Sequence, residues 1–365
     1  MTETRNEIHE CGDDLKVLFV GLGAVGQRHL HNLRALLGNK VEVMAWRTGK
    51  NNHVHFDHSL EQKTGALEKR YGLNVVPSLE EALNQKPQIV FIANPSSLHV
   101  PVALAAAEAG CHLFIEKPLS NSTMGLDELQ AIVQKKSLHV MVGFQFRFNP
   151  GLRAVKQLID DGAIGKVVSC QVHWGEYLPG WHPWEDYRKS YSAQEDLGGG
   201  VILTLCHPFD YLRWLIGEIQ SVSAISGLVG GLELEVEDTA NINVEFQSGV
   251  IGTVHLDYVQ RPPSHWIQIT GQTGTIKWDN ADGTVTYYQA DEQKWHAIPS
   301  PPGFERNNMF LDEVQHFFDC LYKNEEPVVS LNDGIRALEI ALAAKESGVQ
   351  RKVIEVSSEY VFKNV

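Results

Sequence analysis

The feature that most constrains the fold is a repeated alternation of short apolar runs and helical patterns between residues 16 and 144. Five runs are almost continuously apolar, as in strands buried on both faces of a parallel sheet: KVLFVG, VEVMAW, QIVFIAN, HLFIEK and HVMVGF. Helical spacing of apolar residues marks the segments 24–37, 79–84, 98–109 and 122–134. Strand and helix in this order predict a doubly wound α/β sheet over residues 1–145.

The rest of the chain predicts a second domain over residues 146–365. A length of 365 residues exceeds what one hydrophobic core usually supports. Beyond a predicted helix at 200–216, alternating strands with glycine-containing turns, such as TANINVEFQSGVIGTVHLDYV, indicate an α/β domain with a large, mostly antiparallel open sheet. Two helices, near 309–321 and 331–345, close the chain. An alternative is that the final helix packs back on the first domain.

Composition excludes several classes of protein. No apolar run is long enough to span a bilayer, and a net charge of −14 argues against general nucleic-acid binding. The five cysteines are scattered, which is typical of reduced thiols. The polar start of the chain has no secretory pattern, so we expect a cytoplasmic protein. The histidine-rich stretch HVHFDH, with His53, His55 and His58, offers no fourth ligand, and no metal site is expected.

A glycine pattern indicates a dinucleotide site. VLFVGLGAVGQRHL places Gly21, Gly23 and Gly26 after a predicted strand and at the start of a predicted helix, which is the Rossmann context for Gly-x-Gly-x-x-Gly. The three glycines permit, in turn, a tight turn, close approach of a pyrophosphate and close helix–strand packing. The N–H groups at Ala24 and Val25 would favour the anion. The alternative is an ordinary glycine-rich turn.

The end of the second predicted strand bears on the choice of cofactor. Where an NAD enzyme usually has an acidic residue for the ribose, AWRTGK has Arg47 and Thr48. An arginine there can pair with a 2′-phosphate, so NADP(H) is favoured over NAD(H) by a small margin. The alternative is that Arg47 stacks on the adenine or faces solvent.

Three further stretches carry a family resemblance: ANPSSLHVPVALAAAEAGCHLFIEKPLS, GFQFRFNP and GGGVILTLCHPFD. With the glycine pattern, they resemble the Gfo/Idh/MocA oxidoreductases over nearly the whole chain. EYLPGWHPWEDYRKSYSAQEDLGGG is similar to a branch associated with sugar metabolism and surface polysaccharides. The resemblance implies a Rossmann domain, followed by an α/β domain whose open sheet covers the nicotinamide. It also implies cofactor contacts from Asn94, Pro95, His99, Glu116 and Lys117.

The resemblance implies that Lys117 points at the sugar hydroxyl. Pro118 disfavours the helical conformation at Lys117, so the lysine is expected at the carboxyl end of a strand. Ligands of open parallel sheets bind at that edge. The alternative is a solvated surface lysine.

The resemblance also implies that His207 exchanges a proton with the reacting hydroxyl, for which an imidazole is suited at neutral pH. In a continuous helix over 200–216, Thr204, His207, Asp210 and Tyr211 would share one face. The family usually has Asp at position 204, and Asp210 could partly substitute for it. Lys117, His207 and Asp210 are therefore the predicted catalytic residues. The alternative is that His207 caps or braces the helix.

The predicted substrate pocket combines charge and aromatic rings. Arg147 could clamp a carboxylate, phosphate or hydroxyl. Aromatic side chains in the loop before the triple glycine suit the C–H faces and hydroxyls of a carbohydrate, although interfaces share this composition. The remaining predicted substrate contacts are Trp181, His182, Trp184, Tyr187, Arg188 and Thr204.

The expected activity is hydride transfer between NAD(P) and a secondary hydroxyl of a sugar, sugar acid, cyclitol or nucleotide sugar. Two alternatives remain: an NAD-dependent glycosidase of the same fold, and a non-catalytic cofactor-binding sensor. An uncovered face of the antiparallel sheet would expose apolar surface, so we expect a homodimer or homotetramer paired through it.

Overall fold

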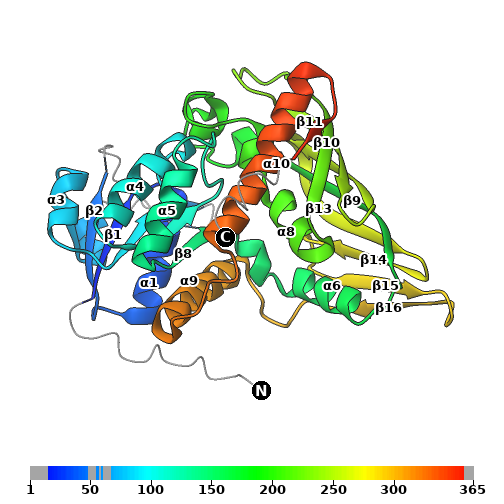
Figure 1. The fold of residues 1–365 in the computed structure, drawn as a ribbon, viewed down its shortest axis with the longest axis horizontal. Coiled ribbons are helices and arrows are strands. Elements are labelled where there is room, and N and C mark those ends of the chain that lie inside the picture. Colours follow the sequence, from blue (N-terminus) through cyan, green and yellow to red (C-terminus); the bar gives the residue numbers. More distant parts are fainter. Residues whose placement is uncertain (1–14, 48–54, 57–58, 61–66, 357–365) are drawn as a thin grey trace. The chain divides into compact units, whose positions relative to one another are not determined.

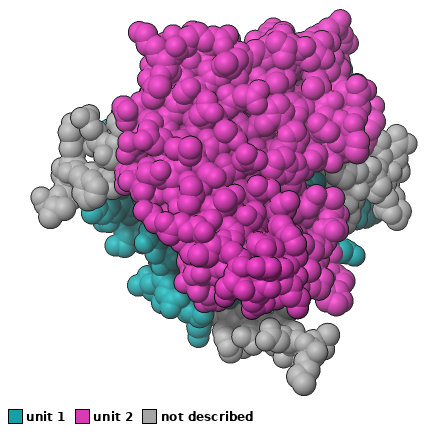
Figure 2. All heavy atoms as spheres, turned by 90° about the vertical axis from the view of Figure 1, so that its right-hand side faces the viewer, with its two compact units in different colours: residues 1–120, 124–145, 305–332 teal, residues 121–123, 146–304, 333–365 magenta. Residues whose placement is uncertain are grey.

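The computed structural model describes residues 15–47, 55–56, 59–60 and 67–356, and it divides into two compact units (Figure 2). Unit 1 comprises residues 1–120, 124–145 and 305–332, and unit 2 comprises 121–123, 146–304 and 333–365. The units part at residue 145, and a segment near the end of the chain, 305–332, is grouped with unit 1. Thr48, His53 and His58 lie outside the described residues, as does the side chain of His55.

Unit 1 is built on a six-stranded sheet in the order β5-β2-β1-β6-β7-β8, with every adjacent pair parallel. Its strands are β1 (Lys16–Val20), β2 (Glu42–Trp46), β5 (Leu73–Val76), β6 (Ile89–Ile92), β7 (His112–Glu116) and β8 (Val140–Gly143). A separate hairpin joins β3 (His55–Phe56) and β4 (Ser59–Leu60). The predicted doubly wound α/β sheet is confirmed, and β5 is a strand that the sequence patterns did not predict.

Aromatic stacking across the central strands forms the core of unit 1. Phe91 stacks between Phe19 and Phe114, with ring centroids 4.8 and 4.9 Å apart, and Phe317 meets Phe91 and Phe114 edge-on. Phe317 belongs to α9, so this late helix packs on the sheet, beside α1 (Figure 1). The helices are α1 (Ala24–Leu37), α2 (Leu67–Tyr71), α3 (Leu79–Asn84), η1 (Ser96–Leu98), α4 (His99–Glu108), α5 (Leu126–Lys136) and α9 (Arg306–Lys323).

Unit 2 is built on a nine-stranded sheet in the order β16-β15-β14-β13-β9-β12-β11-β10-β17. Its pairs are antiparallel except β9–β12, which is parallel, so the predicted mostly antiparallel sheet is confirmed. The strands are β9 (Val167–Tyr177), β10 (Ile219–Gly227), β11 (Thr239–Phe246), β12 (Ile251–Asp257), β13 (Val259–Gly271), β14 (Gly274–Asp279), β15 (Val285–Gln289), β16 (Lys294–Ile298) and β17 (Ile354–Glu355).

The two faces of this sheet differ in burial. Along β11, Ala240 and Ile242 are buried and alternate with the exposed Asn241 and Asn243. We call the buried side the inner face and the other side the outer face. Helix α6 packs against β14 and β15, and Ser347 of α10 accepts the Ala224 N–H of β10. The other elements are η2 (Gln145–Phe148), α6 (Pro150–Asp160), η3 (Leu178–Gly180), η4 (Tyr187–Lys189), η5 (Tyr191–Ala193), α7 (Val201–Thr204), α8 (His207–Ile216) and α10 (Leu331–Gln350).

The predicted continuous helix over 200–216 is wrong, because the segment forms two helices, α7 and α8, separated at Leu205 and Cys206. Pro208 lies in the first turn of α8. Proline has no N–H, and in a continuous helix its ring would clash with the carbonyl of Thr204, four residues earlier. Thr204 and His207 therefore lie on different helices and do not share one helical face.

In the described ranges, none of the helices combines the length and the apolar character that crossing a membrane requires.

Candidate active site

The turn after β1 has the geometry of a dinucleotide-binding loop. Gly21 has φ of +90°, and a Cβ there would lie 2.6 Å from the carbonyl oxygen of Ala93. A Cβ on Gly26 would lie 2.4 Å from the carbonyl oxygen of Gly21. Gly23, by contrast, has open space around it and precedes α1 without a side-chain cap. The turn thus needs glycine at two positions for packing, and it leaves the N-terminus of α1, at Ala24 and Val25, open to an anion.

The loop after β6 adds an unpaired acceptor at the same sheet edge. The side-chain oxygen Oδ1 of Asn94 is buried and, among the described residues, has no hydrogen-bond partner. The backbone N of Asn94 lies 2.7 Å from the position that a Gly21 Cβ would take, so the two turns are in contact. A buried carbonyl oxygen without a partner costs free energy, which a ligand hydroxyl or amide can recover. These residues fit a dinucleotide.

His99 joins two loops of unit 1. Its ring nitrogens lie 2.8 Å from the carbonyl oxygen of Asn94 and 2.9 Å from that of Pro118. The side chain is buried, and burial lowers its pKa, which favours the neutral imidazole. His99 therefore connects the Asn94-Pro95 turn to the segment after Lys117 and helps to hold both in place.

Glu116 and Lys117 follow one another at the carboxyl end of β7. The Glu116 carboxylate is buried, and its Oε1 lies 2.5 Å from His29 Nε2. Its Oε2 accepts the backbone N–H of Lys117 at 3.1 Å. Gly143 of β8 leaves room for this carboxylate, because a Cβ there would lie 3.1 Å from Oε1. The backbone at Lys117 is thus held by Glu116, which is itself held by His29 from α1.

Arg47, at the end of β2, has an acidic partner. Its guanidinium forms an ion pair with Glu68 of α2. A bound 2′-phosphate would have to compete with this carboxylate for the arginine.

In unit 2, His207 is the first residue of α8 and its ring is buried among aromatic side chains. Its ring centroid lies 4.9 Å from that of Phe146 and 5.4 Å from that of Trp174. Trp174 also stacks on His265, at 4.3 Å, and His265 Nε2 lies 3.1 Å from the hydroxyl of Tyr211. Burial lowers the pKa of His265 to about 3, so this imidazole is neutral.

Asp210 and Arg147 are bound to each other. Arg147 donates from Nε and Nη2 to the two Asp210 oxygens, both at 2.8 Å, and Asp210 is 1% exposed. Burial alone would lower the pKa of Arg147, but Asp210 raises it, so the guanidinium remains charged.

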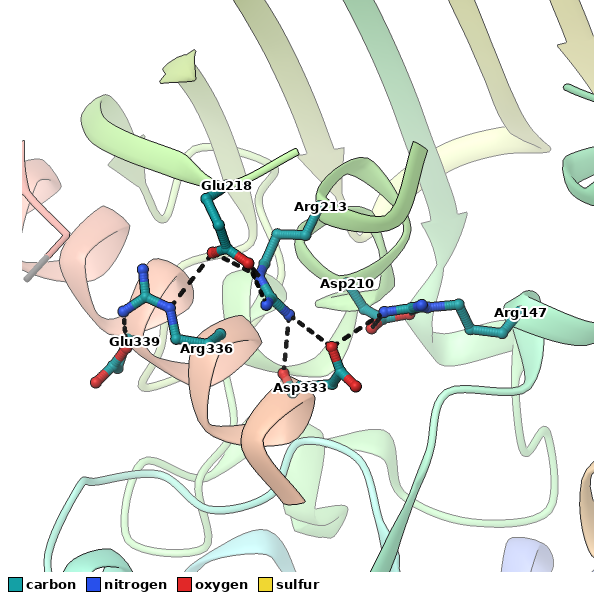
Figure 3. A network of polar contacts seen from close by, with 7 residues as sticks. All are labelled: Arg147, Asp210, Arg213, Glu218, Asp333, Arg336 and Glu339. Carbon is teal, nitrogen blue, oxygen red and sulfur yellow. Dashed lines mark hydrogen bonds and ion pairs between the residues drawn. The ribbon is translucent and has the colours of Figure 1, made fainter. Parts of the chain in front are cut away.

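This ion pair opens a network that continues through Asp333 (Figure 3). Arg213 of α8 contacts Asp333 and also Glu218, and Arg336 of α10 contacts Glu218 and Glu339. Since both oxygens of Asp210 are occupied by Arg147, the geometry gives Asp210 a role in holding α8 in place.

The loop predicted to bind substrate is only partly available for it. Arg188 is about half exposed and pairs with Asp186 and Glu233. The ring of His182 lies 5.4 Å from that of Trp184, and Trp181 meets Tyr258 edge-on at 5.7 Å. Thr204 is buried, and Tyr258 lies beside it.

In this loop, Trp181 offers a polar group to a ligand. In the part of the chain that the structure describes, its buried Nε1 has no hydrogen-bond partner. A buried indole N–H usually has an acceptor, so a substrate oxygen is a suitable partner.

Two residues of these sites were missed by sequence reasoning: His29 and His265. His29 follows Gly26 by three residues, which is about one helical turn, so the helix pattern could have placed it on the face of α1 toward the sheet. His265 alternates with the buried Ile267 and Ile269, which indicates the inner face. No sequence signal pairs His29 with Glu116, because the two are 87 positions apart.

Comparison with known proteins gives two family matches. Residues 15–144 match a family model described as "Oxidoreductase family, NAD-binding Rossmann fold", and residues 152–277 match the "GFO/IDH/MocA C-terminal domain".

Relatives and solved structures agree with these matches. An uncharacterized oxidoreductase of Synechocystis sp. is 32% identical over 286 residues, which is 71% of this chain and 76% of that protein. Myo-inositol 2-dehydrogenase of Thermotoga maritima is 26% identical over 357 residues, covering 94% and 98%. The structure of levoglucosan dehydrogenase in complex with NADH and levoglucosan has a similar fold, with a TM-score of 0.82 at 21% identity, covering 94% and 100%.

Proposed function

Because the chain belongs to the Gfo/Idh/MocA oxidoreductase family, we propose that it transfers hydride between a nicotinamide dinucleotide and a secondary hydroxyl of a sugar, sugar acid, cyclitol or nucleotide sugar. The observation that carries the proposal is the position of Lys117. It follows β7 at the carboxyl edge of the parallel sheet, and only β6 separates β7 from β1 with its glycine turn. Ligands of open α/β sheets bind at this edge.

The dinucleotide is held by residues of unit 1. The open N-terminus of α1 would hold the pyrophosphate, and the unpaired Oδ1 of Asn94 would accept a hydrogen bond from a ribose hydroxyl or from the carboxamide. The bound nicotinamide ring supplies the carbon that gives or takes the hydride.

Lys117 and His207 divide the proton chemistry. The Lys117 ammonium stabilises the negative charge that develops on the substrate oxygen, and His207 takes or gives the hydroxyl proton at its imidazole. Glu116, His29 and His99 act as positioning residues for Lys117. Asp210 acts through Arg147 as a positioning residue for α8, whose first residue is His207.

The substrate class rests on relatives and on the aromatic loop. The relatives are named for myo-inositol and levoglucosan, both of which carry several secondary hydroxyls. The Trp181 indole N–H is a donor for one such hydroxyl, and the rings of this loop suit sugar C–H faces.

The test is a panel of sugars and cyclitols followed at the nicotinamide absorbance. We expect Lys117→Ala and His207→Ala each to lower kcat by about 100-fold or more, the usual contribution of a general acid or base. Cofactor affinity, from titration of protein fluorescence with NADH, should change little. Matched controls are Lys135→Ala and His296→Ala, which remove the same residue types from α5 and β16.

Two other results would point away from this reaction. Release of a free sugar without a net absorbance change would indicate the glycosidase alternative. If the unmodified protein and both variants bind the cofactor but turn over none of the compounds, the result would support the non-catalytic sensor.

We also propose that subunits pair through the outer face of the unit 2 sheet. Ile225 and Ile251 lie on this face and are 66% and 62% exposed. Exposed apolar side chains on a broad sheet favour association. A cytoplasmic location is part of the same proposal, and the four cysteines in the described residues, all buried thiols that form no disulfide with one another, suit a reducing compartment.

A further inference from the structure

The outer face of the unit 2 sheet carries a row of polar and aromatic side chains that the proposed reaction does not use. Strand pairing aligns Asn241 of β11 with His255 of β12, His255 with His173 of β9, and His173 with Trp266 of β13. The residues that flank His173 in β9, Val172 and Trp174, point to the opposite, inner face. The row is therefore separate from His207 and its aromatic neighbours.

His255 is held with both ring nitrogens against oxygen atoms. Nδ1 lies 2.8 Å from Asn241 Oδ1, and Nε2 lies 3.0 Å from Asp257 Oδ2. A neutral imidazole has only one N–H to donate. If Nδ1 donates to Asn241, then Nε2 presents its lone pair toward the Asp257 carboxylate. A cation between Nε2 and Oδ2 resolves this contact between two acceptors.

Asp257 is fixed so that one of its oxygens is free for such a cation. Its Oδ1 accepts the N–H groups of Val259 and Gln260, at 2.8 and 2.6 Å. The carboxylate lies over Gly175 of β9, where a Cβ would come within 2.3 Å of Oδ2.

His173 completes the group. Its ring stacks on that of His255, with centroids 4.7 Å apart. One ligand atom from each of His173, His255 and Asp257 can be chosen so that all three lie within 4.8 Å of one another.

We propose that His173, His255 and Asp257 bind a divalent transition-metal ion of the Zn²⁺ type on the outer face of this sheet. Imidazole and carboxylate are usual Zn²⁺ ligands, at about 2.0–2.2 Å from the metal. The half-buried His173 side chain closes on the ion by rotating. A metal-bound histidine usually donates its second N–H to an oxygen atom. For His255 that oxygen is Asn241 Oδ1, next to Nδ1.

The site joins two parallel strands of unit 2 and leaves the remaining metal positions to water or to another ligand. This metal site is separate from the residues proposed for the reaction. Its ligands lie on the outer face of the sheet, whereas Trp174 and His265, near His207, lie on the inner face. Metal binding therefore stabilises unit 2 rather than taking part in hydride transfer.

The experiment is calorimetric titration of the EDTA-treated, untagged full chain with ZnCl₂ in buffer without chelators. We expect one strong site per chain and a rise in the melting temperature with Zn²⁺. His255→Ala and Asp257→Asn each remove a ligand and should weaken Zn²⁺ binding by at least about tenfold. Asn241→Ala removes the oxygen that supports His255 and should weaken Zn²⁺ binding by about tenfold. In Asp257→Asn the amide oxygen still accepts from Val259 and Gln260, so the local turn is kept.

The matched control is His296→Ala, a histidine on β16 paired with Glu292, which should bind Zn²⁺ like the unmodified chain. Lys117→Ala should lose turnover and keep Zn²⁺ binding, which separates this site from the proposed function. No strong Zn²⁺ site in the unmodified chain, or equal affinity in the His255, Asp257 and His296 variants, would overturn the proposal. Circular dichroism spectra verify that each variant is folded.

Discussion

At the end of β2, the ion pair between Arg47 and Glu68 determines how readily the arginine can meet a phosphate. Both side chains are only partly buried, so the pair is open to exchange with a ligand. The residue pattern alone favoured NADP(H) because of Arg47. It could not reveal the partner of Arg47, since Glu68 lies 21 positions away and no local signal connects the two. The structure places the Glu68 carboxylate beside Arg47, where it would repel a phosphate bound to that arginine.

The first prediction at this scale concerns cofactor preference. Glu68→Gln removes the competing charge and should lower the KM for NADPH. Arg47→Ala should raise it by about ten- to 150-fold, since a hydrogen bond to a charged group is worth about 1.5–3 kcal/mol. The KM for NADH should change little in either variant. Steady-state kinetics with both cofactors measure this. Equal changes for NADH and NADPH would show that Arg47 does not contact the 2′ position.

The second prediction concerns pH. His265 has a pKa of about 3 in the folded protein, against an ordinary value of about 6.5 in the unfolded chain. Between these values only the unfolded chain binds the proton, so the free energy of unfolding should fall as the pH falls from about 6.5 toward 3, by up to about 1.4 kcal/mol per pH unit. Urea unfolding at several pH values measures the slope.

His265→Phe keeps an aromatic ring on Trp174 and cannot titrate, so its acid slope should be shallower than that of the unmodified chain. The control, His296→Ala on the exposed strand β16, should keep the original slope. An identical slope in the His265 variant would mean that another group causes the loss of stability.

At the scale of elements, the strands that the sequence predicted best are the most buried ones. The run QIVFIAN contains β6, whose four residues are all buried, and continuous burial produces a continuous apolar run. β5 was missed because Leu73 and Asn74 are partly or fully exposed and its segment is short. The break between α7 and α8 was missed because apolar residues continue through it, although Pro208 marked the point.

The candidate site divides in the same way. Gly21, Gly23 and Gly26 could be predicted from sequence because their spacing is a pattern within one turn, although Gly21 is also needed for the close approach of Ala93. The Arg147–Asp210 pair could not, because it joins residues 63 positions apart, and each was assigned separately to substrate or catalysis. Contacts between distant segments depend on how the elements pack, which periodicity does not encode.

The prediction at this scale concerns α9. Phe317 is fully buried against Phe91 and Phe114, so Phe317→Ala should lower the free energy of unfolding by about 3–5 kcal/mol. Tyr322→Ala, on the exposed side of the same helix, is the control and should change it by less than about 0.5 kcal/mol. Urea unfolding compares the two. A small effect at Phe317 would mean that α9 is not part of the unit 1 core.

For the whole molecule, the main expectation is self-association through the outer face of the unit 2 sheet. Ile251→Glu places a charge on this face and should shift the protein toward the monomer. Val349→Glu on α10, at a position that is 84% exposed, serves as the control. Light scattering after size-exclusion chromatography gives the mass. A strictly monomeric unmodified protein would contradict the pairing.

The grouping of α9 with unit 1 bears on synthesis at the ribosome. Phe91 and Phe114 emerge early, yet Phe317, which covers their rings, is translated only after β9 to β16, eight of the nine strands of the unit 2 sheet. The nascent nucleotide-binding half therefore exposes an aromatic surface until nearly the end of translation, a period in which chaperones can bind it. A gene shortened after residue 304 would leave that surface uncovered permanently and yield an aggregating fragment.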